Sequence, residues 1–175
     1  EYCTALTDVT ITRNVAYTYS YNTNSARAWG IFNGCGNLTN VTFGDEVARI
    51  GNGLFAGSGI KNITIPATVT EIGEYAFSNC TQLEKVEYAG NAVTKIGSYA
   101  FANASVLTEA PIPNSVTEIG DRAFWRCSSL QSIDIPNSVT EIGHSAFSGC
   151  SSLQSIDIPN SVTEIMGHAF SGCSS

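Results

Sequence analysis

Large apolar side chains recur along this chain every 22 to 24 residues, and the polar positions between them recur in the same phase. The clearest marker is a column of phenylalanines with successive gaps of 23, 22, 24, 23, 23 and 23 residues: Phe32, Phe55, Phe77, Phe101, Phe124, Phe147 and Phe170. A unit this short cannot bury its own large side chains, so neighbouring copies must share one core. The spacing therefore predicts a solenoid of about seven stacked units.

Within one unit, the apolar spacing changes from a strand pattern to a helix pattern. Leu130, Ile133 and Ile135 end in alternation, which predicts a short strand, and the Pro136-Asn137-Ser138 segment then turns the chain. After Val139 and Ile142 re-enter the core, Ala146, Phe147 and Cys150 follow the spacing of one helix face. We therefore expect parallel pairing between the strands of successive units and a short helix on the opposite side.

Three segments recur in phase at least six times: Leu-x-x-Ile-x-Ile-Pro, Ser-Val-Thr-Glu-Ile-Gly and Ala-Phe-x-x-Cys-Ser-Ser-Leu. Over nearly the whole chain this pattern resembles the BspA-like leucine-rich repeat family. The resemblance implies an α/β solenoid, a right-handed leucine-rich-repeat coil with a parallel concave sheet and short helices or turns on the convex side. It also implies a secreted or cell-surface protein, typically bacterial or protist, that engages host or matrix partners and has no catalytic residues.

One solenoid domain is expected over residues 1–175, with an irregular first unit at 1–31 and regular repeats of 22 to 24 residues at 32–175, cut within a unit at the C-terminus. Val15 lies seventeen residues before Phe32, where a regular unit needs eight, which indicates an insertion at about 16–28. This insertion contains Tyr17, Tyr19 and Tyr21 among Ser and Asn residues, a composition typical of binding loops. The alternative is that the tyrosines shield the core of the first coil.

All six cysteines fall in one column, three residues after a column phenylalanine or three before Leu6: Cys3, Cys35, Cys80, Cys127, Cys150 and Cys173. Six cysteines in a secreted chain would ordinarily suggest three disulfides. Because Ser58 and Ala104 replace Cys in the column without a matching loss elsewhere, we instead predict reduced thiols buried as small apolar groups. Neighbouring coils would still bring thiols within disulfide range. Zinc is not expected, since the ligands lack the usual short spacings.

The segments Ser115 to Asn137 and Ser138 to Asn160 differ at only four positions. Asp121, Arg122, Trp125 and Arg126 in the first copy become His144, Ser145, Ser148 and Gly149 in the second. On a helix these offsets form one outward stripe. Trp125 between Arg122 and Arg126 has the residue types of a binding hot spot, although an exposed aromatic that packs on Arg side chains is equally common.

The outward strand positions form a polar and partly acidic ladder that includes Glu87, Asp134 and Asp157. Such a ladder suits recognition of a protein or glycan, or is a solvated sheet. Glu118, Glu141 and Glu164 form a second acidic column, which we expect to be solvated because the loop spacing of calcium-binding repeats is absent.

Charge and motif content exclude several other functions. Eight Lys and Arg against fifteen Asp and Glu give a net charge of −7, and no basic run could neutralise a nucleic-acid backbone. No apolar stretch has the length of a membrane span. A phosphate loop, a nucleophile elbow and a metal-ligand set are all missing, so we expect neither an enzyme nor a cofactor.

The sequence thus predicts a non-catalytic interaction module of a surface or secreted protein that adheres to or recognises an extracellular or host protein or glycan. A rigid spacer without its own ligand is the alternative. The last unit, where the Gly column reaches Met166, has no recognisable polar cap. We therefore expect an open apolar end and weak end-to-end self-association.

Overall fold

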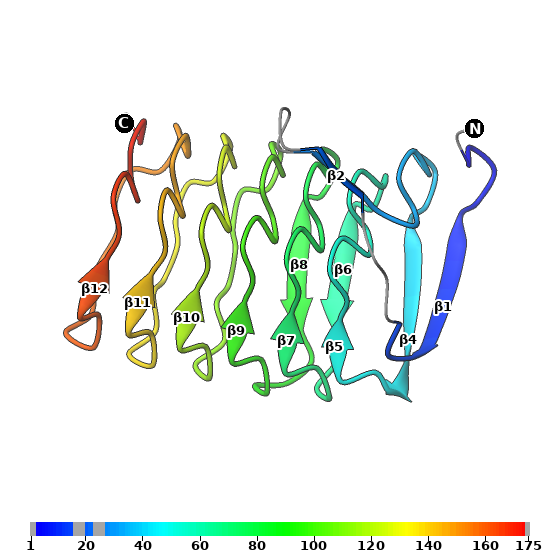
Figure 1. Cartoon of the computed structure of the whole chain (residues 1–175), viewed down its shortest axis with the longest axis horizontal. Coiled ribbons are helices and arrows are strands. Elements are labelled where there is room, and N and C mark those ends of the chain that lie inside the picture. Colours follow the sequence, from blue (N-terminus) through cyan, green and yellow to red (C-terminus); the bar gives the residue numbers. More distant parts are fainter. Residues whose placement is uncertain (1–2, 16–19, 23–26, 174–175) are drawn as a thin grey trace.

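The computed structural model describes residues 3–15, 20–22 and 27–173. The chain forms one elongated stack of coils with its two termini at opposite ends (Figure 1). Every regular element within these residues is a β-strand: β1 (Asp8–Arg13), β2 (Ser20–Asn22), β3 (Arg27–Trp29), β4 (Asn40–Glu46), β5 (Arg49–Ile50), β6 (Asn62–Ile65), β7 (Glu71–Ile72), β8 (Lys85–Tyr88), β9 (Lys95–Ile96), β10 (Glu118–Ile119), β11 (Glu141–Ile142) and β12 (Glu164–Ile165).

The Leu-x-x-Ile-x-Ile segments form one side of each coil, here called the strand face. β1 pairs with β4 and β6 with β8, both in parallel, which confirms the predicted pairing for these units. Beyond β8, pairing between units on this face is reduced to a single bridge between Glu109 and Ser132. Pro111 and Pro113 contribute to this loss, because proline has no N–H to donate to a ladder.

The longest ladder lies in a second column of strands, each only two residues long. Six of them pair in parallel in the order β12-β11-β10-β9-β7-β5. Each presents a charged residue outward and an isoleucine to the core, as in Glu141 and the fully buried Ile142. The Val-Thr-Glu-Ile-Gly segments contain no proline, so every residue keeps its N–H for the neighbouring coil. The predicted parallel sheet is present, and its longest part is formed by these short strands.

The predicted helix around each column phenylalanine is wrong, because the described residues form turns there. Residues two before and two after the phenylalanine have left-handed backbones, for example Arg122 (φ 53°) and Arg126 (φ 58°) around Phe124. A right-handed helix cannot contain such residues at every turn. The N–H groups of Arg122, Phe124 and Arg126 instead point to the next coil and donate to the carbonyls of His144, Ala146 and Ser148 at 2.8–2.9 Å. Each turn is therefore hydrogen-bonded to its successor.

The phenylalanine column forms the centre of the core. Consecutive rings stack with centroids 5.3 to 5.5 Å apart and planes within 16° of parallel, from Phe32 to Phe170. The five rings from Phe55 to Phe147 are at most 2% exposed. The aromatic spacing in the sequence therefore corresponds to one continuous stack, as predicted.

The six cysteines lie in the predicted column, and all are free thiols in the structure. Four of them donate a hydrogen bond to the backbone carbonyl of the phenylalanine in the preceding unit; the Sγ to O distance is 3.1 Å for Cys80 and 3.2 Å for Cys150. Burial raises the pKa of Cys80 to about 11 and that of Cys150 to about 12. The buried thiol is thus a neutral donor as well as a space-filling group, a role that the sequence did not reveal.

The insertion in the first unit contains an antiparallel hairpin, in which Tyr21 of β2 pairs with Ala28 of β3. Tyr17 and Tyr19 lie outside the described residues, as does the side chain of Tyr21. The backbone of the insertion therefore includes a hairpin, and the proposed role of its tyrosines stays a prediction.

Candidate recognition surfaces

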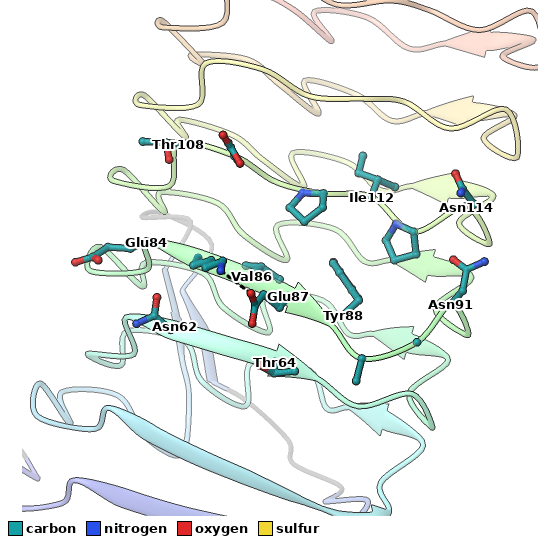
Figure 2. A pocket seen from close by; sticks show the side chains of 16 residues that line it. Asn62, Thr64, Glu84, Val86, Glu87, Tyr88, Asn91, Thr108, Ile112 and Asn114 are labelled. Carbon is teal, nitrogen blue, oxygen red and sulfur yellow. Dashed lines mark ion pairs between the residues drawn. The ribbon is translucent and has the colours of Figure 1, made fainter.

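A groove of about 950 Å³ opens on the strand face between β8 and the following unit. Figure 2 shows it with Asn62 and Thr64 of β6 at one side, β8 along its floor, and Thr108 to Asn114 at the other side. Its position coincides with the break in the ladder after β8. The groove is therefore a consequence of lost pairing between two successive coils.

One extra residue in the sequence contributes to this break. The gap of 24 between Phe77 and Phe101 arises because Ala89 and Gly90 replace the single proline that ends the other strands at this point. A Cβ on Gly90 would lie 2.6 Å from the Cβ of Ala67, so only glycine fits where the longer connection passes the preceding coil. The groove is thus built into a unit whose length differs from that of its neighbours.

The groove combines acceptors, one cation and an apolar wall. Lys85 Nζ forms a salt bridge of 2.5 Å with Glu87 Oε1, and this contact lowers the pKa of Glu87 and raises that of Lys85. Glu84 and Glu109 add two further carboxylates, while burial raises the pKa of Tyr88 and keeps its hydroxyl protonated. Such a lining can bind a ligand by hydrogen bonds and apolar contact without any bond-breaking chemistry.

Of the strand-face residues predicted from the sequence, only Glu87 lines the groove. Asp134 and Asp157 occupy the same column on later units, where both are exposed and lie outside it. Sequence reasoning missed Tyr88 and Asn91 as lining residues. The signal that could have found them was the extra residue between Phe77 and Phe101.

A second surface lies on the turns, where the structure brings Arg122, Trp125 and Arg126 together with Tyr99. The guanidinium of Arg126 lies 4.3 Å from the centre of the Trp125 ring. Arg122 Nη1 donates to the Tyr99 hydroxyl at 2.8 Å, and its guanidinium is 5.4 Å from that ring. We call these four residues the Arg-Trp surface. Sequence reasoning missed Tyr99, although it precedes Phe101 by the same two residues as Arg122 precedes Phe124.

The predicted acidic column is only partly acidic. Glu118, Glu141 and Glu164 are neighbours in register across β10, β11 and β12. Glu118 also accepts a salt bridge of 2.8 Å from Lys95 of β9, and further along the sheet Arg49 contacts Glu71 at 3.1 Å. Charges therefore alternate at one end of the ladder, and two carboxylates adjoin at the other.

Within the described residues, no helix has the length and hydropathy needed to cross a lipid bilayer.

Comparison with known proteins gives a consistent family assignment. Residues 28–130 and 88–175 match the sequence profile described as BspA type Leucine rich repeat region, in six copies. No curated protein matches the chain.

Among solved structures, a leucine-rich repeat protein from Bacteroides ovatus is 32% identical with a TM-score of 0.66, over 82% of this chain and 49% of that one. A leucine rich cell surface protein from Faecalibacterium prausnitzii is 31% identical with a TM-score of 0.55, over 98% and 52%. A leucine rich repeat protein of T. pallidum, 22% identical with a TM-score of 0.57 over 87% and 86%, shares the fold. This chain thus spans about half the length of the first two structures. Repeat pattern, stacked core and sequence match agree: the chain belongs to the BspA-type leucine-rich repeat family.

Proposed function

We propose that this chain is a non-catalytic recognition module of a surface or secreted protein, and that it binds an extracellular protein or glycan through the strand-face groove. Family membership and the solenoid support the coarser assignment, a protein-interaction or scaffold module. Support for a surface location comes from the Faecalibacterium prausnitzii relative, which is described as a cell surface protein.

The observation that carries this proposal is the groove itself. The other units repeat nearly the same small polar residues on the strand face, whereas the unit of β8 combines a break in the ladder, an extra residue and a half-buried tyrosine. A concave site with a few polar groups beside apolar side chains is the usual form of a ligand site. The groove therefore distinguishes a binding module from a uniform rod.

A rigid spacer is the second candidate function. Hydrogen bonds join successive coils both along the short strands and along the turns, for example Gly143 to Ile119 at 2.8 Å and Phe124 to Ala146 at 2.8 Å. Two such ladders on different sides of each coil give a stiff stack. A spacer would need this stiffness and would not need the groove.

A pair of matched variants distinguishes the two functions. Thr64→Trp places a large ring in the groove from an exposed outward position of β6, and Thr42→Trp places the same ring at the equivalent exposed position of β4, outside the groove. Retention of the wild-type chain and both variants would be measured on a glycan array and on immobilised extracellular-matrix proteins. A recognition module predicts loss of retention for Thr64→Trp alone. Equal retention of all three chains, or no retention of the wild type, would support the spacer.

A further inference from the structure

The two nearly identical repeats provide a comparison of the chain with itself. Their 23-residue units differ at four positions, and all four lie in a single turn, at residues 121–126 in one copy and 144–149 in the next. The two turns share their backbone conformation, since Arg122 and Ser145 have φ values of 53° and 57°, and Arg126 and Gly149 of 58° and 79°. The same fold thus accommodates either set of side chains.

The residues of the Arg-Trp surface are not those that the backbone favours. A side chain in the left-handed region costs about 1 kcal/mol relative to glycine, and Arg122 and Arg126 both occupy that region. The contacts of their guanidinium groups with Tyr99 and Trp125 offset this cost at about 0.5–1 kcal/mol each. Because the two effects are of similar size, stability alone does not explain why these residues replace Ser and Gly.

The charges of this surface are also unusual for the chain. In an acidic protein of net charge −7, Arg49, Lys85 and Lys95 each form a salt bridge with a glutamate. Within the part of the chain that the structure describes, no carboxylate lies within ion-pair distance of Arg122 or Arg126. Two guanidinium groups are thus held in place by aromatic rings while most of their N–H donors stay available.

The surface is small and has an aromatic edge. Trp125 is half-buried, and the equivalent positions of the adjoining coils hold the small residues Ala102 and Ser148, which leave the indole accessible along the stack. One turn offers far less than the roughly 800 Å² that a stable protein partner covers. A single sugar ring bearing a carboxylate or a sulfate matches this size, because a guanidinium binds such groups in bidentate fashion and the indole offers an apolar face.

We propose that the Arg-Trp surface binds an anionic glycan. This site lies on the turns, independent of the groove on the strand face, and it adds a second and oppositely charged recognition surface to the proposed function.

The neighbouring repeat supplies the variant that tests this site. In the copied-turn variant, Asp121→His, Arg122→Ser, Trp125→Ser and Arg126→Gly give the turn the residues of the next unit, which folds with them. In the transposed variant, the same four changes are combined with His144→Asp, Ser145→Arg, Ser148→Trp and Gly149→Arg, which move the surface by one coil. Thr64→Trp serves as the control for the groove.

Binding would be titrated with heparin, which carries sulfates, with hyaluronan, which carries only carboxylates, with a neutral chitin oligosaccharide and with a poly-glutamate peptide. We expect the wild type to bind heparin or hyaluronan, and which of the two it prefers identifies the anionic group. The copied-turn variant should bind at least tenfold more weakly with no loss of thermal stability. The transposed variant should recover binding, and Thr64→Trp should bind as the wild type does.

Equal glycan binding by the wild type and the copied-turn variant would overturn the proposal. So would wild-type binding to poly-glutamate but to neither charged glycan, since the partner would then be an acidic peptide. Failure to bind any of the four probes would also overturn it, and would leave the test of the groove unaffected because that test uses a different variant.

Discussion

Replacing Phe101 by alanine tests the physical basis of the fold most sharply. Phe101 is 1% exposed and stacks on Phe77 and on Phe124 with centroid distances of 5.3 Å on both sides. Removing the ring opens a cavity that adjoins two coil interfaces at once. In a solenoid each unit is stabilised by its neighbours alone, so the loss cannot be made up by distant contacts.

The magnitude follows from burial and stacking. Truncation of a fully buried phenylalanine costs about 3–5 kcal/mol, and the loss of two ring pairs puts Phe101→Ala in the upper part of that range. Phe170 is the matched control, since it occupies the same column in the last unit, is half-buried, and stacks on one ring only, Phe147 at 5.5 Å. With less area buried and one ring pair, Phe170→Ala should cost about 2 kcal/mol.

Urea denaturation followed by circular dichroism would measure both variants. Because repeat arrays can unfold in parts, native-state hydrogen exchange should accompany it. For Phe101→Ala we expect faster exchange at the amides of Phe101 and Asn103, which donate to the next coil, and little change in β12. A cost of less than about 1 kcal/mol for Phe101→Ala, or an equal cost for the two variants, would refute the view that the continuous stack holds the coils together.

Two further predictions concern the thiol column and the C-terminal end. Burial raises the pKa of Cys80 from its ordinary 9.0 to about 11, so the unfolded chain loses this proton first as the pH rises. The thiol's contribution to stability is thus complete below pH 9 and falls by about 1.4 kcal/mol per pH unit between pH 9 and 11; urea titrations across this range should show a smaller decline for Cys80→Ala, and identical slopes would contradict the assignment. At the other end, Ile165 is 47% exposed whereas Ile142, one coil earlier, is fully buried. We expect weak self-association in light scattering at high protein concentration that Ile165→Glu abolishes, and a wild type that remains monomeric would show that this face does not associate.

The sequence predicted the stack because burial of large apolar residues leaves little choice. Phe101 and its equivalents could be aligned by eye, and the column of cysteines followed from the same frame. Periodicity of this kind reports which side chains share a core, and the structure agrees with it at each described coil.

The helix prediction failed for a physical reason. Ala146, Phe147 and Cys150 can face the core from a helix, but also from a turn with left-handed corners, so their spacing does not distinguish the two. The sequence did contain the discriminating signal, because the positions two before and two after the phenylalanine repeatedly hold residues that tolerate positive φ, such as Gly53 and Gly57.

The groove could not be predicted in the same way. It depends on backbone pairing that is absent between β8 and the next coil, whereas a pattern of side chains reports packing. The extra residue at Gly90 marked the position but not the consequence. The pairing of Arg122 with Tyr99 was equally hidden, since the two residues are 23 apart in the chain and meet only when coils stack.

The account rests on the claim that this solenoid is a recognition module whose groove binds an extracellular ligand. The most direct measurement is the equilibrium binding of wild type, Thr64→Trp and Thr42→Trp to whichever matrix protein or glycan retains the wild type. We predict at least tenfold weaker binding for Thr64→Trp and wild-type binding for Thr42→Trp. Equal affinity of all three chains for that ligand would contradict the claim.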